Sequence, residues 1–393
     1  MRRTIPVLYR NPSEIAALWT ACEPRLSFHS NGNQMNLNDL DTPVLLADLD
    51  ILERNIARMA RISHNGGKAL RPHTKTHKTP EIARMQIAAG AQGLTCAKLG
   101  EAEVLVDAGF DDVFIANQIV GPLKIERLLN LALRARITVA IDSVEVALPI
   151  GDAAAARGIR VPVRIEVDTG LGRAGARSAP EVLAIARCAA ESRGLEFAGI
   201  FTHEGHLYKS AEPALAAAHA AGQMLGTADM LADAGLPCEA ISVGSTPGAS
   251  LMAPYEGLTE LRPGVYVFND RTQVRLGAPG EACALTVLAT VVSVRSDGKI
   301  IIDAGTKSMA SDCPFEDRTF GEIVGHPEVR FVGASEEHGH LMPEGGTTLR
   351  VGDRMRIIPN HACTCVNMHD MMTAVRGETV EATWTIAGRG KIR

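Results

Sequence analysis

The chain has 393 residues, of which 46% are hydrophobic and 22% charged, and its formal net charge is −5. These values are ordinary for a globular chain and give no electrostatic reason to expect a nucleic acid or a membrane as partner. The length predicts one large domain with a smaller one, or two to three domains. No apolar run approaches the roughly 20 residues of a membrane span, and the N-terminus lacks the apolar core of a secretory signal.

Eight cysteines are scattered through the chain, and only Cys363 and Cys365 lie close together. No C-x-x-C pair occurs. In a chain of this length, that pattern indicates free thiols in a reducing compartment rather than a disulfide framework. We therefore expect a cytoplasmic protein.

Residues 1–41 are expected to form an N-terminal extension with a short helix around 13–21 and no chemistry of its own. From residue 42 a regular pattern begins, with a strand at 43–48 and helical spacing at 52–62. Strands are then predicted near 67–73, 93–97, 112–117, 137–141, 161–168, 195–202, 239–243 and 260–267. Helices are predicted between them, near 80–90, 99–108, 122–134, 143–157, 178–192, 211–234 and 248–254.

This alternation predicts a parallel sheet covered by helices. Eight such units in about 200 residues favour a closed (β/α)8 TIM-type barrel over residues 42–270. The alternative is a doubly wound open sheet. After residue 270 short β-branched runs dominate, near 285–294, 299–302, 328–332, 354–358 and 379–386, and they predict a smaller, mostly antiparallel β domain at 271–393. The strand at 43–48 is a candidate for this β domain as well as for the barrel.

The segment 70–78, with the sequence LRPHTKTHK, gathers two lysines and two histidines at the end of a predicted strand. Such groups are costly to bury unless they meet an anionic or electrophilic partner. Burial and neighbouring cations can remove the proton of Lys75, and a neutral amine is a nucleophile towards aldehydes. The hypothesis is that Lys75 forms a Schiff base with pyridoxal phosphate. A solvated basic loop explains the segment equally well.

Two glycine-rich turns follow predicted strands. The turn GSTPG at 244–248 follows the seventh strand, where barrels often hold phosphate, and its small residues and hydroxyls suit an anion. The alternative is an ordinary Gly-Ser turn. The turn GLGRAG at 170–175 matches G-x-G-x-x-G, but it lies deep in the chain with no acidic residue about 20 positions on. We interpret it as a turn that aims Arg173 into the barrel mouth.

His361 and Cys363 are two residues apart, and on an extended segment they would face the same side. Imidazole and thiolate together suit a borderline-soft cation such as Zn²⁺. Two protein ligands leave coordination positions open, as Lewis-acid catalysis requires. The alternative is a surface loop with an incidental histidine and cysteine.

Several motifs occur in one order along the chain: RPHTKTHK (71–78), DTGLGRAG (168–175), VGSTP (243–247), GVY (264–266), DAG (303–305), EHG (337–339) and PNHAC (359–363). Together they resemble the D-threonine aldolase and D-serine dehydratase group of alanine-racemase-like (fold type III) pyridoxal phosphate enzymes. The resemblance runs from about residue 42 to the C-terminus. It implies a barrel followed by a β domain, a homodimer, and Lys75 bonded to the cofactor.

The resemblance also implies roles for individual residues. The catalytic residues are Lys75 and His361. Arg173 would lie by the phenolic oxygen of pyridoxal 5'-phosphate, Tyr208 and Tyr266 around its ring, and Gly244, Ser245 and Thr246 around its phosphate. His361 and Cys363 would bind a divalent metal, Mn or Zn. His73 and His77 are expected to shape the Lys75 pocket, Cys96 to pack at a strand end, and Lys78 to be a surface lysine at a helix N-terminus.

The implied activity is that of a lyase acting on small D-β-hydroxy-α-amino acids, with retro-aldol cleavage of a D-threonine-like substrate to glycine and an aldehyde. The alternative is dehydration of D-serine or D-3-hydroxyaspartate to an oxo acid and ammonia. Cys363 matches the dehydratases, which have His-x-Cys at the metal, whereas segments 94–101 and 365–370 look more like the aldolases. A racemase is less favoured because no tyrosine follows Tyr266, and a non-catalytic cofactor carrier because such relatives lack the β domain.

Overall fold

Eight parallel strands form one sheet in the computed structural model, which describes residues 35–393 except 315 and 317. The strands are β2 (Ala69–Leu70), β3 (Leu94–Cys96), β4 (Asp112–Gln118), β5 (Arg136–Ile141), β6 (Val161–Glu166), β7 (Leu195–Phe201), β8 (Ala240–Val243) and β9 (Glu260–Leu261). Their order is β2-β9-β8-β7-β6-β5-β4-β3. The backbone N–H of Thr95 donates to the carbonyl of Pro72 at 2.8 Å, which joins the two ends of the sheet. The predicted barrel is confirmed, and the open sheet is wrong.

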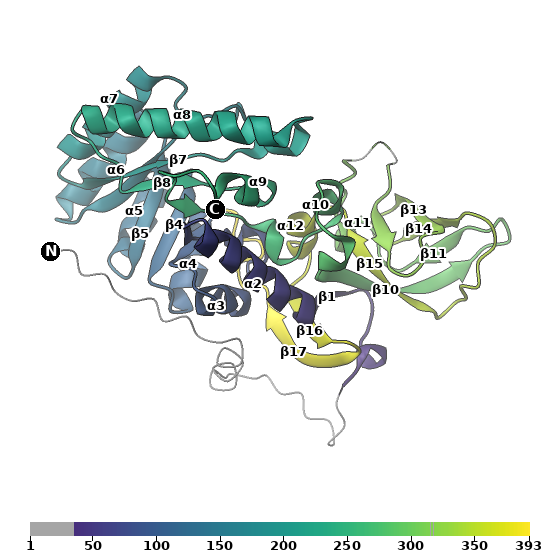
Figure 1. The fold of residues 1–393 in the computed structure, drawn as a ribbon. Coiled ribbons are helices and arrows are strands. Elements are labelled where there is room, and N and C mark those ends of the chain that lie inside the picture. The colour runs from purple at the N-terminus through teal and green to yellow at the C-terminus, as the bar shows by residue number, and fades with distance from the viewer. Residues whose placement is uncertain (1–34, 315, 317) are drawn as a thin grey trace.

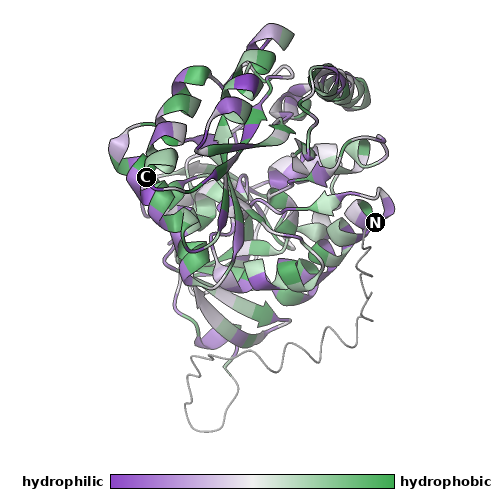
Figure 2. Ribbon diagram, turned by 90° about the vertical axis from the view of Figure 1, so that its left-hand side faces the viewer, coloured by the Kyte–Doolittle hydropathy of each residue, from purple (hydrophilic) through white to green (hydrophobic). Residues whose placement is uncertain are grey.

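Seven helices follow barrel strands and surround the sheet (Figure 1). They are α3 (Pro80–Ala88), α4 (Leu99–Asp107), α5 (Pro122–Ala132), α6 (Val144–Ala156), α7 (Ala179–Glu191), α8 (Pro213–Asp233) and α9 (Thr246–Met252). Proline occupies the first turn of several of them, where no intrahelical donor is lost. The helices carry both hydrophilic and hydrophobic residues along their turns (Figure 2), as expected for helices with one buried face.

The interior of the barrel contains charged side chains as well as apolar ones. On β6, Val163 and Ile165 belong to the large core shared with the helices, whereas Arg164 between them points the opposite way. Arg164 Nη1 donates to Glu260 Oε1 at 2.6 Å, and Arg71 Nε donates to Glu260 Oε2 at 2.8 Å. Arg262 lies over the rings of Phe114 and Phe201 in the same space. We call Arg71, Arg164, Glu260 and Arg262 the interior cluster.

The second sheet has nine strands in the order β11-β14-β13-β12-β15-β10-β1-β16-β17. They are β1 (Val44–Asp48), β10 (Leu285–Val294), β11 (Ile300–Ile302), β12 (Gly321–Ile323), β13 (Val329–Ala334), β14 (Gly339–Pro343), β15 (Arg354–Pro359), β16 (Met371–Arg376) and β17 (Thr379–Thr385). A further pairing of β10 with β11 closes the first six into a ring. All pairings are antiparallel except that of β1 with β16. The mostly antiparallel β domain is confirmed, although β12, β14 and β16 were not predicted.

Strand β1 joins the β domain and not the barrel, so the first strand and the last two strands of the described chain lie in one sheet (Figure 1). Helix α2 (Leu49–Asn65) then runs from this sheet to the barrel. The domain boundaries given above stay a prediction, and the helix expected at 13–21 lies outside the described residues. No helix in the described part of the chain is long and apolar enough to cross a membrane.

Candidate active site

Lys75 lies at the mouth of the barrel, in a short 3-10 helix (Thr74–Thr76) that follows β2. Part of its surface reaches solvent, but burial lowers the pKa of its amine. Cys363 acts in the opposite direction, and Arg173 adds to the lowering. The structure therefore provides what the sequence argument required, a lysine at a strand end with a reduced hold on its proton.

Two imidazoles near Lys75 are kept neutral. Burial, followed by the charge of Lys75, lowers the pKa of His203 to about 3. The same two causes lower the pKa of His73 well below its ordinary value. His203 Nδ1 lies 2.7 Å from the carbonyl oxygen of Gly244, so its Nδ1–H donates there and its other nitrogen has no proton. At neutral pH the mouth thus contains two neutral imidazoles beside one amine.

Lys78 is not a surface lysine, and that prediction is wrong. Its side chain is only 9% exposed, and Nζ lies 3.1 Å from Glu101 Oε1 and 2.9 Å from Asn367 Oδ1. Its backbone is left-handed, with φ at 53°, and its carbonyl accepts the N–H of Gly388 at 2.9 Å. Lys78 therefore joins the barrel to two segments of the β domain, because the C-terminal chain folds back over it.

His361 and Cys363 do not share an extended segment, as expected, but the start of a short helix, α12 (Ala362–Val366). His361 is the extended residue before that helix, and Cys363 is in its first turn. The two side chains are in hydrogen-bonding contact, and the Cys363 thiol lies 3.3 Å from Thr76 Oγ. The expected backbone is wrong, but the expected pair forms and lies against the Lys75 segment.

The environment of this pair favours an imidazolium and a thiolate. Burial lowers the pKa of His361, but Cys363 and two nearby carboxylates outweigh it and raise the pKa to about 9. Burial raises the pKa of Cys363, but His361 and Lys75 outweigh it and lower the pKa. A divalent cation has the charge to replace the proton in such a pair. Within the described ranges, no group of three or more His, Cys, Asp or Glu is arranged to hold a metal, so the pair is a two-donor site.

The glycine-serine turn is hydrogen-bonded to a buried carboxylate that the sequence did not indicate. Glu204 is completely buried, and it accepts the backbone N–H of Gly244 at 2.9 Å and the hydroxyl of Ser245 at 3.0 Å. A Cβ on Gly248 would lie 2.6 Å from the same carboxylate and from Ser245 Oγ, so a larger residue there would displace these two side chains. Two of the donors expected for phosphate are therefore engaged by Glu204.

Thr246, the next residue of the turn, faces the loop after β9. Its Oγ accepts the backbone N–H of Tyr266 at 3.1 Å, which leaves its own proton free for another acceptor. A Cβ on Gly264 would lie 3.1 Å from both the carbonyl of His73 and Thr76 Oγ. The loops after β8 and β9 thus meet the Lys75 segment, where barrels commonly bind phosphate.

Arg173 projects from its glycine-rich turn and is 55% exposed, with Nη2 at 3.3 Å from Glu166 Oε1. Asp168 shapes that turn, since its Oδ1 accepts the N–H groups of Gly170 and Gly172 at 3.1 and 3.0 Å. Arg173 is near enough to Lys75 to affect its pKa. The turn therefore directs a guanidinium towards the mouth, as the sequence suggested.

The two tyrosines differ in their surroundings. Tyr266 is buried, and its hydroxyl accepts the side-chain N–H of Gln86 at 3.0 Å. Tyr208 is hydrogen-bonded to Gln273, and burial, with Cys363 next, raises its pKa. Tyr208 is thus on the α12 side of the site and Tyr266 on the α3 side. Cys96 is buried at the end of β3, as expected.

A cavity of about 930 Å³ lies on the rim of the mouth, beside the glycine-rich turn. Its lining includes Asp168, Gly170, Arg177, His206 and His219. The Nδ1 atom of His206 is buried and has no hydrogen-bond partner among the described residues. The cavity has both polar and apolar lining residues, and its volume exceeds that of a small amino acid.

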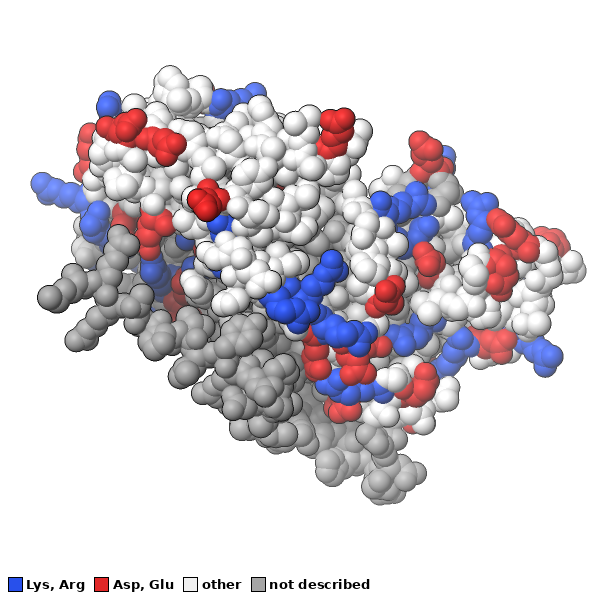
Figure 3. Space-filling model, viewed as in Figure 1, with Lys and Arg blue, Asp and Glu red and all other residues white. Residues whose placement is uncertain are grey.

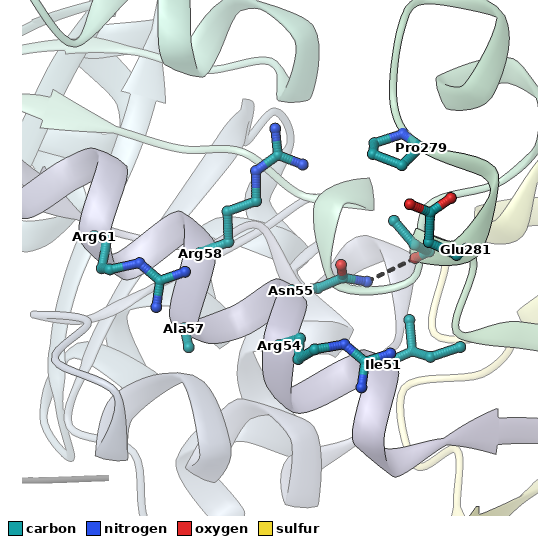
Figure 4. A pocket seen from close by; sticks show the side chains of 9 residues that line it. Ile51, Arg54, Asn55, Ala57, Arg58, Arg61, Pro279 and Glu281 are labelled. Carbon is teal, nitrogen blue, oxygen red and sulfur yellow. Dashed lines mark hydrogen bonds between the residues drawn. The ribbon is translucent and has the colours of Figure 1, made fainter. Parts of the chain in front are cut away.

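A second cavity, of about 310 Å³, lies over α2 and contains none of the predicted site residues (Figure 4). Arg54, Arg58 and Arg61 line one side of it and Glu281 the other. All three arginines are exposed, and Figure 3 shows Lys and Arg side chains on the face of the molecule that carries α2. They lie on the exposed face of the helix, where charged side chains are solvated, so they do not indicate a binding site.

Sequence reasoning missed Asp312 as well as Glu204. Asp312 Oδ2 accepts the Nδ1–H of His361 at 2.7 Å. Neither carboxylate is part of a recognisable motif, and each is remote from the group it contacts: Asp312 by 49 positions, and Glu204 by 40 from Gly244. The one available signal for Glu204 was its position just after a predicted strand.

The chain belongs to the alanine-racemase-like enzymes. Residues 47–272 match the family model of the alanine racemase N-terminal domain, and residues 284–375 match that of a serine dehydratase domain. The chain thereby falls within the D-threonine aldolase and D-serine dehydratase group, whose members are lyases.

Three relatives define the comparison. The chain is 35% identical to a D-threonine aldolase of an Arthrobacter species, over 89% of this chain and 93% of the relative. It is 37% identical to a D-threo-3-hydroxyaspartate dehydratase of Delftia sp. strain HT23, over 89% and 98%. A crystal structure of D-threonine aldolase from Filomicrobium marinum superposes with a TM-score of 0.85 at 34% identity, covering 93% of this chain and all of the other.

Proposed function

We propose that this protein is a lyase that uses pyridoxal 5'-phosphate and a divalent metal to cleave D-β-hydroxy-α-amino acids, releasing glycine and an aldehyde from a D-threonine-like substrate. The observation that carries the proposal is the meeting of two groups at the barrel mouth. Lys75 is an amine with a lowered pKa, and the His361–Cys363 pair lies against the same short segment through Thr76. The relatives named as aldolases support the same reading.

The residues around Lys75 fit pyridoxal phosphate. Lys75 would bond to the aldehyde, because burial favours its nucleophilic neutral form. Arg173 would lie near the phenolic oxygen, and Tyr208 and Tyr266 would flank the ring. Gly244, Ser245 and Thr246 would form the phosphate turn, with the free proton of Thr246 as the direct donor and Glu204 holding the other two residues in place.

The residues around His361 fit a divalent cation. An imidazole and a thiol of lowered pKa are the donors that Zn²⁺ and similar ions prefer. Manganese is the other candidate, although it prefers oxygen ligands to either of these donors. Only two protein donors are present among the described residues, so the substrate's β-hydroxyl has room to approach.

When bound, the cofactor supplies an electron sink for the carbanion that forms at the substrate's Cα. The protein has to remove the proton of the β-hydroxyl and to deliver a proton to Cα of the glycine product. Lys75 is the group at the mouth that can hold these protons, with the neutral His203 near it. His361 is assigned a catalytic role because it fixes the side of the site on which the hydroxyl lies.

Dehydration is the second candidate, and Cys363 is the observation that favours it. A thiolate at this position is the donor typical of the dehydratase members, and the Delftia relative bears a dehydratase name. In that reaction the hydroxyl leaves as hydroxide after the α-proton is removed, and an oxo acid and ammonia are formed. The same Lys75 and metal pair serve both outcomes.

Product analysis separates the two reactions. Purified protein with pyridoxal phosphate and Mn²⁺ or Zn²⁺ is incubated with D-threonine, D-serine or D-threo-3-hydroxyaspartate. Glycine and acetaldehyde from D-threonine are expected. Oxobutyrate, pyruvate or oxaloacetate with ammonia would establish the dehydratase instead. The L-isomers and a chelator are the controls, and turnover that survives the chelator would contradict the metal requirement.

We expect the active form to be a homodimer in the cytoplasm, with small D-amino acids as its substrates. Scattered free thiols support a reducing compartment: the seven cysteines that the structure describes form no disulfide with one another. Light scattering on the cofactor-loaded protein tests the oligomeric state, and a monomeric active species would contradict it.

A further inference from the structure

Asp312 contacts the predicted metal ligand His361 through a single carboxylate oxygen. Oδ2 lies 2.7 Å from His361 Nδ1 and 2.9 Å from Thr364 Oγ, which donates its hydrogen to it. Because a carboxylate only accepts, the ring proton of His361 must be on Nδ1. The other ring nitrogen, Nε2, is then the one available to a cation.

The position of Asp312 is itself built by the neighbouring chain. Asn360, the residue before His361, donates its side-chain N–H to the Asp312 carbonyl at 2.8 Å. Arg271 Nη1 in turn donates to Asn360 Oδ1 at 2.7 Å. Two residues before Asp312, Ala310 adopts a left-handed backbone with φ at 69°, which turns the chain after α11 (Thr306–Met309). The carboxylate therefore has a fixed place relative to His361.

A histidine that binds a metal through one nitrogen is oriented by the hydrogen bond that its other nitrogen makes. An anionic acceptor also makes the ligating nitrogen more basic. We propose that Asp312 is a positioning residue, which holds His361 in the tautomer and orientation that present Nε2 to the catalytic cation. This inference rests on the proposed function, since it takes His361 and Cys363 as the metal ligands.

A structural role for the same contact predicts different behaviour. The side chains of His361 and Asp312 are 43% and 39% exposed, and a pair this open to solvent contributes little to folding. A stabilising pair would change the unfolding midpoint and leave metal affinity alone. A positioning residue does the reverse, and this difference is what the experiment measures.

The test compares Asp312→Ala, Asp312→Asn and a matched control, Asp297→Asn. Asp297 is also an exposed aspartate of the β domain, and it pairs with Arg295 far from α12. The dissociation constant for Mn²⁺, and separately for Zn²⁺, is measured by competition with a chromophoric chelator. We expect Asp312→Ala to weaken binding about 10- to 100-fold. Asp312→Asn retains an acceptor oxygen and should recover part of the loss, and Asp297→Asn should match the wild type.

Two further readouts apply to the same proteins. The affinity for pyridoxal phosphate and the unfolding midpoint without metal should be unchanged in both Asp312 variants. With Co²⁺ in place of Mn²⁺, the ligand-field absorption should shift in Asp312→Ala, whereas the sulfur-to-metal band that reports Cys363 should persist. These signals report ligand geometry without turnover.

Metal affinity within twofold of the wild type in both variants would overturn the inference. A parallel loss of metal affinity, cofactor affinity and stability would also overturn it, because the contact would then be structural. If the wild type itself binds neither Mn²⁺ nor Zn²⁺, the metal part of the proposed function fails, and the inference fails with it. That result differs from the first two, because it is visible before any variant is made.

Discussion

Buried ionisable groups occur in two parts of the same barrel, and they are treated in opposite ways. In the interior cluster, Glu260 is hydrogen-bonded to Arg71 and Arg164, and the charged form of Glu260 is favoured. Burial raises the pKa of Glu260, but Arg164 and Arg71 outweigh it and lower the pKa to about 2. At the mouth, Lys75, His73 and His203 form no ion pair with a carboxylate among the described residues, and burial lowers the pKa of each.

The contrast separates buried charges that stabilise the fold, in the interior cluster, from buried groups that stay available for chemistry, at the mouth. A buried carboxylate paired with guanidinium groups keeps its charge, whereas an amine with a lowered pKa and no such partner is available to exchange protons and react. The two clusters lie one above the other along the same strands, since Arg262 of the interior cluster also affects the pKa of Lys75. The groups that are available for chemistry therefore lie at the mouth of the barrel, above the ion-paired interior cluster.

The largest expected effect comes from the mouth. Lys75→Ala should lower the rate of aldehyde release by at least about 10²–10⁴-fold, because it removes both the cofactor's anchor and a proton carrier. It should not lower the free energy of unfolding, since an amine that is costly to bury disappears. The control Lys307→Ala, an exposed lysine paired with Glu337, should change neither quantity. Retained turnover in Lys75→Ala would contradict the proposed role of Lys75 as cofactor anchor and proton carrier.

The interior cluster should show the reverse pattern. Glu260→Gln leaves the buried Arg164 without a carboxylate partner and Arg71 with Asp112 alone, and it should lower the free energy of unfolding by about 3–5 kcal/mol. The remaining folded protein should still bind pyridoxal phosphate with wild-type affinity. Urea unfolding measures the first quantity and cofactor titration the second. Glu239→Gln, an exposed residue paired with Arg136, is the control and should cost about 0–1 kcal/mol.

Glu204 tests whether the contrast holds for a second buried carboxylate. It accepts hydrogen bonds from Gly244 and Ser245, which are neutral donors, where Glu260 has two guanidinium groups. Glu204→Gln should therefore cost only about 1–3 kcal/mol of unfolding free energy. It should weaken pyridoxal phosphate binding more than binding of pyridoxal, which lacks the phosphate. Equal losses for the two ligands would show that Glu204 does not act on the phosphate turn.

The smallest effects are expected in the pH dependence of stability. Burial and Lys75 lower the pKa of His203 from 6.5 to about 3, so below pH 6.5 the unfolded chain binds a proton that the folded chain does not. Stability is therefore lost as pH falls through that window. Glu260, with its pKa lowered from 4.5 to about 2, keeps its contribution above pH 4.5 and loses it towards pH 2.

These windows distinguish the two regions. Between pH 6.5 and 4.5, His203→Gln should reduce the slope of unfolding free energy by up to about 1.4 kcal/mol per pH unit, the value for one proton. Glu260→Gln should leave the slope in that range unchanged. Urea unfolding at several pH values across the range provides the measurement. An unaltered slope in His203→Gln would mean that this imidazole is already protonated in the folded protein.

The local pattern of apolar and helix-starting residues was sufficient to predict most strands and helices of the barrel. Strands such as β5 and β7 are mostly apolar, and helices such as α3 and α7 have a proline in the first turn. Periodicity therefore predicted nearly every barrel element. It failed for β14, whose five residues include a glycine, a histidine and a proline, and for β16, which directly follows the α12 segment. Both strands are defined by their neighbours in the sheet rather than by their composition.

The sequence by itself determined the reactive residue types and their order: a lysine with flanking histidines after one strand, an arginine on a glycine-shaped turn, a glycine-serine turn, and a histidine and a cysteine near the end. It did not determine which of them are free to act. Glu204 engages two donors of the phosphate turn, Asp312 orients His361, and Lys78 is buried by chain that arrives from position 388. Only the tertiary structure decided these contacts, because each joins residues about 40 to 310 positions apart. They exist only once the barrel has closed and the β domain has folded against its mouth.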